Sequence, residues 1–488
     1  MIDANYGLSA VAMEIFKSSR GGDKLSFEGF VYRKNTSNIT TQNWRCENKG
    51  CKGSVSTSLR YHTERQVVTR QIHNHPPVPA RVEVVSALDK AMEQAETSNL
   101  RPRRIISDMN LSREATTEAP TRKAISQRIQ RKRKHSEIGH EVAPLNRSGI
   151  IIPEKYKTTK RGEEEHRFLL YDNEDDGNDR LIVFSSEVML DELSKNNIWM
   201  MDGTFKVAPT LFLQLYTIHV IIGGPNGHVF PCIYALLPNK TTQTYIKLFQ
   251  ILKDARPNLA PHLCIMDFEL ASKRALLTEF PQVSVAGCFF HLTQAVWRKV
   301  QGAGLTENYI NQPEVREAVK SLCALAFLDV ENVNEAFEQL QEYVEQIAIE
   351  GLTDLYDYFE DTYIGRQGRR GVRRNPQIPK EMWNVKERTI SGIPRTTNKL
   401  EGWHRGIQAM LDSPHPSIFR CFAALQREEN LQVNDLFRFK AGHDVQKSKK
   451  TVKNMNKRLT TLITRLAEGT IERAEFLRGV GYAITLNV

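Results

Sequence analysis

The 488-residue chain has few of the features that mark secreted or membrane proteins. It contains seven cysteines, an odd number scattered along a long sequence, which does not suit a disulfide framework. The best candidate for a membrane span, 211–222, is interrupted by Gln214 and His219 and is followed by a turn. The N-terminus lacks the basic-then-apolar order of a signal peptide. These absences predict a soluble intracellular protein.

The charge balance is basic. Lys and Arg number 67 against 57 Asp and Glu, which gives a net charge of +10 and a pI near 9.1. Such a chain suits a polyanionic partner. Its length allows two or three domains, each with its own core. We therefore expect a multidomain protein, and the strand and helix patterns along it predict the α+β class.

Short runs of alternating apolar and polar residues fill the segment 20–79, which follows an N-terminal segment, 1–19. Turn formers separate the runs 25–32, 42–46, 53–60 and 65–72. The pattern predicts a small antiparallel sheet, too small to hold together without a staple. Two thiols and two imidazoles offer the tetrahedral set that zinc prefers. They are Cys46, Cys51, His73 and His75. The alternative is two free thiols and two surface histidines, and the spacing is not that of a C₂H₂ finger.

Several motifs in this segment resemble the FLYWCH zinc finger family. They are Phe30-Val31-Tyr32, Trp44-Arg45-Cys46, Cys51 and His73-Asn74-His75-Pro76-Pro77. The resemblance implies a β-sheet stapled by structural Zn²⁺ at the same four residues, which binds DNA or protein. Nearby cations would then contact phosphates, although a charge cluster is as often a solvated face. They are Arg33, Lys34, Arg45, Lys49 and Lys52.

The segment 80–165 is a basic connector with helical patterns. It contains 101–104 (RPRR) and 128–134, which ends in Arg131, Lys132, Arg133 and Lys134. Three readings remain open for these basic runs: a nuclear localisation signal, a clamp on the DNA backbone, or a solvated linker helix. A nuclear localisation signal would place the protein in the nucleus. We expect the acidic stretches 163–165 and 172–179 to form a linker loop.

Three acidic residues lie in segments where a charge is costly to bury. Asp202 lies within the apolar run 197–207, Asp267 closes the run 263–268, and Glu401 opens the helical stretch 401–411. Desolvation disfavours a buried carboxylate. Each alone could be a satisfied polar residue at the end of a strand. Together they favour a site for divalent cations, with Mg²⁺ or Mn²⁺ held by carboxylates and water.

The order of predicted elements around these acids indicates an α/β core of the ribonuclease-H-like type. Strands are expected at 197–207, 213–222, 228–237, 263–268 and 283–289, and helices at 242–255 and 270–279. This order gives a mixed five-stranded sheet in which the first and fourth strands are neighbours. Asp202 and Asp267 would then lie close together. We expect the core to span 166–300 and to be completed by 391–425.

The same region resembles Mutator-like (MULE) transposases. The supporting motifs are Met201-Asp202-Gly203-Thr204-Phe205, Met266-Asp267-Phe268-Glu269, Phe280-Pro281, Cys288-Phe289-Phe290-His291 and Thr396-Thr397-Asn398-Lys399-Leu400-Glu401-Gly402-Trp403. The resemblance implies a catalytic Asp202, Asp267 and Glu401. Glu269 competes for the third place, although it could simply cap the helix that follows. In the family, Cys288 and His291 form a signature beside the active site and would orient the site or flanking DNA. A zinc site there would need two further ligands.

The segment 301–390 is rich in helix formers and predicts an all-helical insertion, with helices over 313–327, 330–350 and 352–363. In related transposases such an insertion helps to shape the DNA path. Its loop 366–374 (RQGRRGVRR) is a candidate backbone contact or a surface loop. A basic helical C-terminal tail is expected over 426–488.

Two functions from different classes are consistent with these features. The first is a Mutator-like transposase that cleaves and transfers DNA strands at terminal repeats and works as a homo-oligomer. The second is a host-recruited transcriptional regulator that binds DNA and has lost catalysis. The presence of all three acids favours the first. A ribonuclease-H-type nuclease acting on RNA is disfavoured by the zinc module and the helical insertion.

Overall fold

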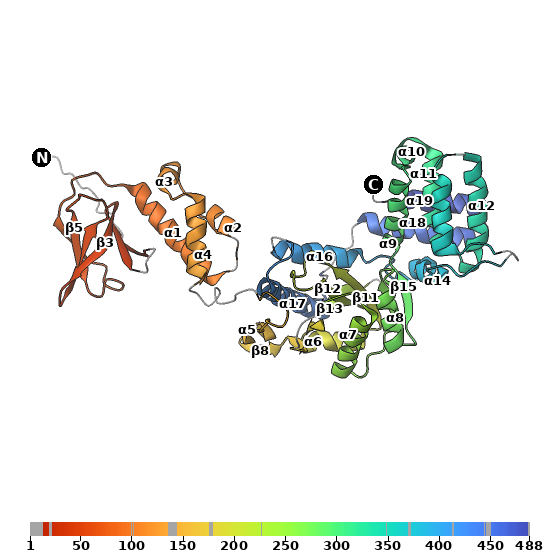
Figure 1. The fold of residues 1–488 in the computed structure, drawn as a ribbon, viewed down its shortest axis with the longest axis horizontal. Coiled ribbons are helices and arrows are strands. Elements are labelled where there is room, and N and C mark those ends of the chain that lie inside the picture. The colour runs from red at the N-terminus through yellow and green to blue at the C-terminus, as the bar shows by residue number, and fades with distance from the viewer. Residues whose placement is uncertain are drawn as a thin grey trace. The chain divides into compact units, whose positions relative to one another are not determined.

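The computed structural model describes residues 13–18, 22–98, 100, 102–134, 144–174, 179–225, 227–347, 349–368, 372–411, 414–443, 445 and 450–486. The chain divides into two compact units, Met1–Val142 and Ala143–Val488. Each is coloured by its place in the sequence in Figure 1. The two units are described separately.

The first unit begins with a six-stranded antiparallel sheet in which each strand pairs with the next. Its strands are β1 (Glu14–Lys17), β2 (Asp23–Phe27), β3 (Phe30–Ser37), β4 (Thr41–Cys46), β5 (Ser54–Ser58) and β6 (Val67–Gln71). The run 25–32, predicted as one strand, is a hairpin, because Glu28 and Gly29 turn the chain with φ of 51° and 78°. Strand β1 was not predicted. The antiparallel sheet itself is confirmed.

Apolar side chains on both faces of this sheet are buried. On one face, Trp44 packs with Leu25, Tyr32 and Val55. On the other face, Phe16 and Val31 pack against Val85 of helix α1. The helices are α1 (Pro79–Thr97), α2 (Pro102–Ser107), α3 (Arg113–Glu118) and α4 (Arg122–Lys134). They bury their own small core of Ala91, Ala95, Ile105, Ile125 and Ile129. The helices of the basic connector therefore form a packed bundle.

The second unit is built on a mixed sheet of seven strands in the order β15-β14-β11-β12-β13-β10-β9. Its strands are β9 (Leu169–Asp172), β10 (Ile182–Phe184), β11 (Ile198–Thr204), β12 (Gln214–Ile222), β13 (His228–Leu237), β14 (Leu263–Met266) and β15 (Ser284–Gly287). The predicted number of strands, five, was too small, because β10 and β9 extend the sheet beyond β13. The predicted acidic loop, 163–165 and 172–179, is wrong in part, and its residues 175–178 lie outside the described part of the chain. Glu164 and Glu165 lie in a hairpin of β7 (Thr158–Arg161) and β8 (Glu164–Arg167), and Asp172 lies in β9.

The predicted neighbours are confirmed within this sheet. Strand β11 is antiparallel to β12 and parallel to β14, and β14 is parallel to β15. Helices α6 (Glu187–Lys195), α7 (Thr242–Ala255) and α8 (Leu270–Glu279) pack on one face, and α16 (Asn398–Leu411) and α17 (Ile418–Lys440) pack on the other. The C-terminal part of α17 also reaches the first face through Val433 and Leu436. The short helix α5 (Glu154–Lys157) places Tyr156 against α17.

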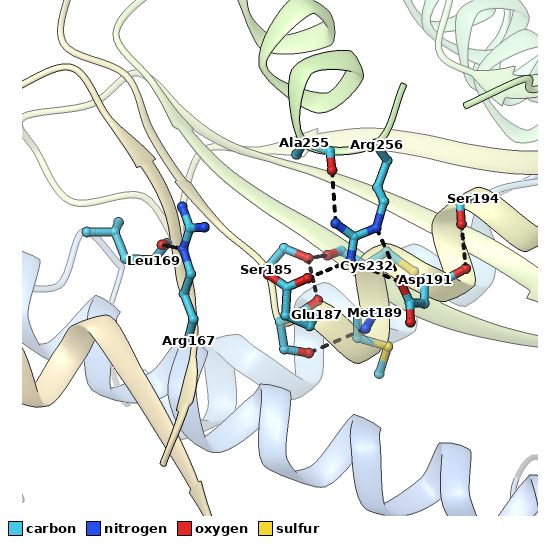
Figure 2. Close-up of polar contacts among 11 residues, drawn as sticks. Arg167, Leu169, Ser185, Glu187, Met189, Asp191, Ser194, Cys232, Ala255 and Arg256 are labelled. Carbon is cyan, nitrogen blue, oxygen red and sulfur yellow. Dashed lines mark hydrogen bonds and ion pairs between the residues drawn. The ribbon is translucent and has the colours of Figure 1, made fainter. Parts of the chain in front are cut away.

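Polar contacts fix helix α6 to its surroundings (Figure 2). The Oγ of Ser186 caps the helix by accepting a hydrogen bond from the backbone N–H of Met189. Ser185 Oγ donates to the carbonyl of Cys232 on β13 at 2.7 Å. Arg256, just after α7, donates to Asp191 at 2.9 Å. These contacts hold α6 against β13 and against the end of α7.

The remaining helices form a separate layer that continues from β15. They are α9 (Phe289–Gly302), α10 (Thr306–Asn311), α11 (Pro313–Ala324), α12 (Val333–Ile347), α13 (Leu352–Phe359), α14 (Lys380–Trp383), α15 (Lys386–Ile390), α18 (Lys450–Ala467) and α19 (Arg473–Ala483). One core joins them. The C-terminal helices are not a tail, because Leu459, Phe476 and Val480 are buried in this core with α11. In the described part of the chain, no helix is both long and apolar enough to cross a membrane.

Candidate functional sites: a zinc cluster and a carboxylate centre

The four predicted zinc ligands meet at one end of the first sheet. One ligand atom from each of Cys46, Cys51, His73 and His75 lies within 4.8 Å of all the others. Cys46 Sγ is 3.3 Å from His75 Nε2, and Cys51 Sγ is 3.5 Å from His73 Nδ1. Two thiols and two imidazoles in this arrangement match a structural zinc site. The predicted cluster is confirmed.

Neighbouring groups orient the two imidazole rings. Tyr32 OH is 2.8 Å from His73 Nε2, and the carbonyl of Pro76 is 2.9 Å from His75 Nδ1. The opposite nitrogen of each ring is thereby left for the cluster, as in metal sites where an outer partner fixes the tautomer. Burial, and then the nearby His75, lower the pKa of His73. A neutral ring is the form that binds a metal.

Close packing around His73 explains Phe30 of the motif and a neighbouring glycine, Gly53. The Phe30 ring stacks on the His73 ring with centroids 3.6 Å apart. A Cβ at Gly53 would lie 2.5 Å from His73 Nδ1, so only glycine leaves room for the ring. The backbone N–H of Gly53 also donates to Cys51 Sγ at 3.2 Å.

The cations predicted to contact DNA are mostly exposed, but some of them already have partners within the protein. Arg33, Lys34, Arg45, Lys49 and Lys52 are all exposed. Lys34 Nζ donates to Tyr61 OH at 3.1 Å. In α4, Arg131 is exposed and Lys132 forms an ion pair with Glu96 at 2.7 Å. The side chains of Arg133 and Lys134 lie outside the described residues.

In the second unit Asp202 lies on β11 and Asp267 directly follows the parallel strand β14. Met200 on β11 pairs with Ile265 on β14. Continuing this register by two residues sets Asp202 beside Asp267. Helix α16, which carries Glu401, contacts β11. Among the described residues, only the zinc cluster brings three or more such ligand atoms within 4.8 Å of one another, so at least one pair of the three carboxylates is farther apart than that.

The two aspartates share a local arrangement. In each, Oδ1 accepts a hydrogen bond from the next backbone N–H: from Gly203 to Asp202 at 2.8 Å, and from Phe268 to Asp267 at 2.6 Å. Asp202 is mostly buried, with 13% of its side chain exposed, whereas Asp267 is 48% exposed. Burial raises the pKa of Asp202 to about 6, and the charges of Asp267 and Glu401 add to the rise. Asp202 is therefore a carboxylate that a nearby cation would stabilise.

A histidine lies beside each aspartate. His291 Nδ1 is 3.5 Å from Asp267 Oδ1, and His404 Nδ1 is 3.8 Å from Asp202 Oδ2. Burial opposes the charge on His291, but the hydrogen bond and the charge of Cys288 raise its pKa to about 9. Burial lowers the pKa of His404 to about 4. His404 was not predicted, although its position three residues after Glu401 places both on one side of α16.

Cys288 connects the end of β15 to the segment before α16. Its fully buried Sγ accepts hydrogen bonds from the backbone N–H and the hydroxyl of Thr397, at 3.2 and 3.3 Å. The carbonyl of Thr397 in turn accepts the N–H of Glu401. Burial opposes ionisation of the thiol, but the contact with His291 lowers the pKa of Cys288. The predicted pair of Cys288 and His291 thus touches the elements that carry Asp267 and Glu401.

Glu269 has other partners. One carboxylate oxygen accepts from Tyr245 OH at 2.8 Å, and the other pairs with Lys240 at 2.9 Å. Glu269 stands at the N-cap of α8, but its side chain makes no capping hydrogen bond. The alternative role as a cap is therefore wrong. Its contacts instead tie the start of α8 to Tyr245 of α7 and to Lys240, which follows β13.

The arginine-rich loop of the helical layer is partly neutralised. Arg373 pairs with Glu360 at 2.6 Å and with Glu338 at 2.8 Å. Arg366 pairs with Asp361. Residues 369–371 lie outside the described part of the chain, and Arg374 is exposed. Arg366 and Arg373 therefore have protein partners, which weakens the argument that they contact a DNA backbone.

Comparison with known families agrees with the motifs and their order. Residues 15–75 match the family model of the FLYWCH zinc finger domain, and residues 198–295 match that of the MULE transposase domain. No curated protein matches the chain. A FLYWCH zinc finger followed by a MULE transposase domain supports a Mutator-like, transposase-type DNA-binding protein, with structural Zn²⁺ in the first domain.

Proposed function

We propose that the second unit cleaves DNA strands and transfers their ends, using divalent cations held by Asp202, Asp267 and Glu401. The observation that carries this proposal is the register of β11 and β14, which sets Asp202 beside Asp267 under the helix that bears Glu401. The strands β13-β12-β11-β14-β15 are three antiparallel strands followed by two parallel ones. This is the order expected of a ribonuclease-H-like core.

The residues present suit Mg²⁺ or Mn²⁺. Carboxylate oxygens are the ligands that these hard cations prefer. The pKa of Asp202 is raised to about 6 by burial and by the other two acids, and a bound cation would offset both effects. When bound, such ions activate a water or a DNA 3′-OH and stabilise the leaving oxygen.

Backbone and side-chain groups of the chain itself would prepare this site. The N–H groups of Gly203 and Phe268 hold one oxygen of each aspartate and leave the other oxygen for ligands. In the metal-free protein the raised pKa of His291 favours its charged form, which would orient the carboxylate of Asp267 3.5 Å away. Cys288 holds the segment from which α16 begins, and with it Glu401.

Incubation of the full-length, zinc-loaded protein with duplex DNA in Mg²⁺ or Mn²⁺ tests this proposal. Nicking that chelator abolishes would support it. Terminal-repeat DNA from the element that encodes the chain is the substrate to use first, and a homo-oligomer is the active form we propose. A protein that binds DNA but leaves it uncut in both metals would support the regulator instead.

We also propose a nuclear location, on the basic runs 101–104 and 128–134. A fluorescent fusion tests it. Replacement of the basic residues in 128–134 by glutamine should spread the signal into the cytoplasm, and a signal that stays nuclear would exclude this run as the address.

A further inference from the structure

Three cations lie side by side across the zinc-stapled sheet. Lys24 on β2 pairs in register with Arg33 on β3, and Arg33 pairs with Arg45 on β4. Directly opposed residues of antiparallel strands have their Cβ atoms about 5 Å apart and point to the same face, and like charges there are destabilising. The sheet therefore holds an unfavourable arrangement that an external anion would relieve.

Only part of this charge is neutralised within the unit. Glu47 forms ion pairs with Lys24 and with Arg81 of α1. Within residues 13–18, 22–98 and 102–134, no carboxylate forms an ion pair with Arg33 or Arg45, and both are exposed. Arg70 on β6 is also exposed. Its Nε donates to Ser56 Oγ at 2.8 Å, and Ser56 pairs with Asn43, two residues before Arg45. Arg70 therefore lies on the same face.

Helix α1 covers the neighbouring part of this face and stops short of the arginines. Val31, two residues before Arg33 and on the same face, packs with Val85 of α1. Lys34, the next residue after Arg33, belongs to the opposite face. Its Nζ bonds Tyr61 OH and lies 5.3 Å from the centre of that ring. Arg33, which forms no ion pair among the described residues, and Lys34, which bonds Tyr61, therefore lie on opposite faces of β3 although they are adjacent in sequence.

We propose that the arginine face, formed by Arg33, Arg45 and Arg70, binds the phosphates of duplex DNA. This inference rests on the proposed function, since it takes DNA as the substrate of the chain. Guanidinium groups match phosphate oxygens in pairs and are weakly hydrated. Exposed arginines that form no ion pair with a carboxylate of the described unit are therefore suited to bind a polyanion such as DNA.

The test measures binding of the full-length, zinc-loaded protein to a fluorescent DNA duplex over a series of salt concentrations. The double variant R33Q/R45Q should reduce the slope of log affinity against log salt by about 2, since each phosphate contact contributes about 0.9. The variant K17Q is the control, because Lys17 on β1 forms an ion pair with Asp23 on the opposite face of the sheet, and it should leave the slope unchanged. Both should keep their zinc, measured by atomic absorption.

Thermal unfolding separates lost contacts from lost structure. Because Arg33 and Arg45 repel each other, their replacement should leave the melting temperature of the zinc unit equal or higher. An unchanged slope in R33Q/R45Q, or an equal loss in K17Q, would overturn the inference, while DNA cleavage by the wild type would still support the proposed function. A wild type that binds no DNA would defeat both. Tighter binding to duplex RNA than to DNA would overturn the assignment of DNA to this face.

Discussion

Replacing Cys288 by alanine should loosen the segment that begins the Glu401 helix. The Cys288 sulfur accepts two hydrogen bonds from Thr397, and both residues are fully buried. The alanine variant leaves a buried N–H and a buried hydroxyl without this acceptor. An unpaired buried donor costs about 1–3 kcal/mol, but the hydroxyl can rotate toward another acceptor. We therefore expect a loss of about 2–4 kcal/mol in the free energy of unfolding.

Cys264 offers a matched control. It is equally buried, on the adjacent strand β14, and makes no hydrogen bond through its sulfur among the described residues. Cys264→Ala removes the same atom and should cost about 1 kcal/mol, as expected for a small cavity. Cys288→Ser keeps an acceptor for Thr397 and should recover part of the loss.

Urea unfolding and Mg²⁺-dependent DNA nicking measure the two consequences. Cys288→Ala should lower the nicking rate at temperatures where the variant is still folded, whereas Cys264→Ala should not. Equal losses of stability in the two alanine variants, with equal nicking rates, would refute the reasoning that Cys288 holds this segment.

Three further outcomes follow from the same geometry. Chelator or Cys51→Ser should unfold the zinc unit, because metal binding supplies about 10–16 kcal/mol in comparable small domains; circular dichroism that is unchanged in chelator would contradict this. Gly53→Ala should weaken zinc binding in a chelator competition, because a Cβ there would lie 2.5 Å from His73 Nδ1; an equal affinity would argue against the close approach. The raised pKa of Asp202, about 6 against an unfolded value near 3.9, makes the metal-free protein lose stability as pH rises from about 4 through 6, by up to about 3 kcal/mol. Asp202→Asn should remove that loss, and urea unfolding at pH 4.5 and 7.5 would show whether it does.

Periodicity made much of the second unit predictable. The helices Thr242–Ala255 and Leu270–Glu279 and the strand His228–Leu237 agree with the expected bounds, because their apolar spacing is strong and turn residues flank them. The added strands β9 and β10 were missed. β10 has only three residues, Ile182–Phe184, and so short a run carries little signal without its neighbours.

Long-range pairing was predictable only where the order of elements implied it. The neighbouring positions of Asp202 and Asp267 follow from the strand order. The bond between Cys288 and Thr397 does not, because it depends on how the chain returns after the helical layer. The arginine face was hidden for a similar reason. Arg33 and Lys34 are adjacent in sequence, and only the strand register separates their surroundings.

The most direct test of the central claim compares four carboxylate variants in Mg²⁺-dependent nicking of terminal-repeat DNA. Asp202→Asn, Asp267→Asn and Glu401→Gln should each show no nicking above background and should bind DNA with the wild-type salt dependence, since the basic surfaces are untouched. Glu269→Gln should keep most of the activity, because Glu269 is engaged by Tyr245 and Lys240. Activity that is lost in Glu269→Gln but kept in Glu401→Gln would contradict the assignment of the third acid.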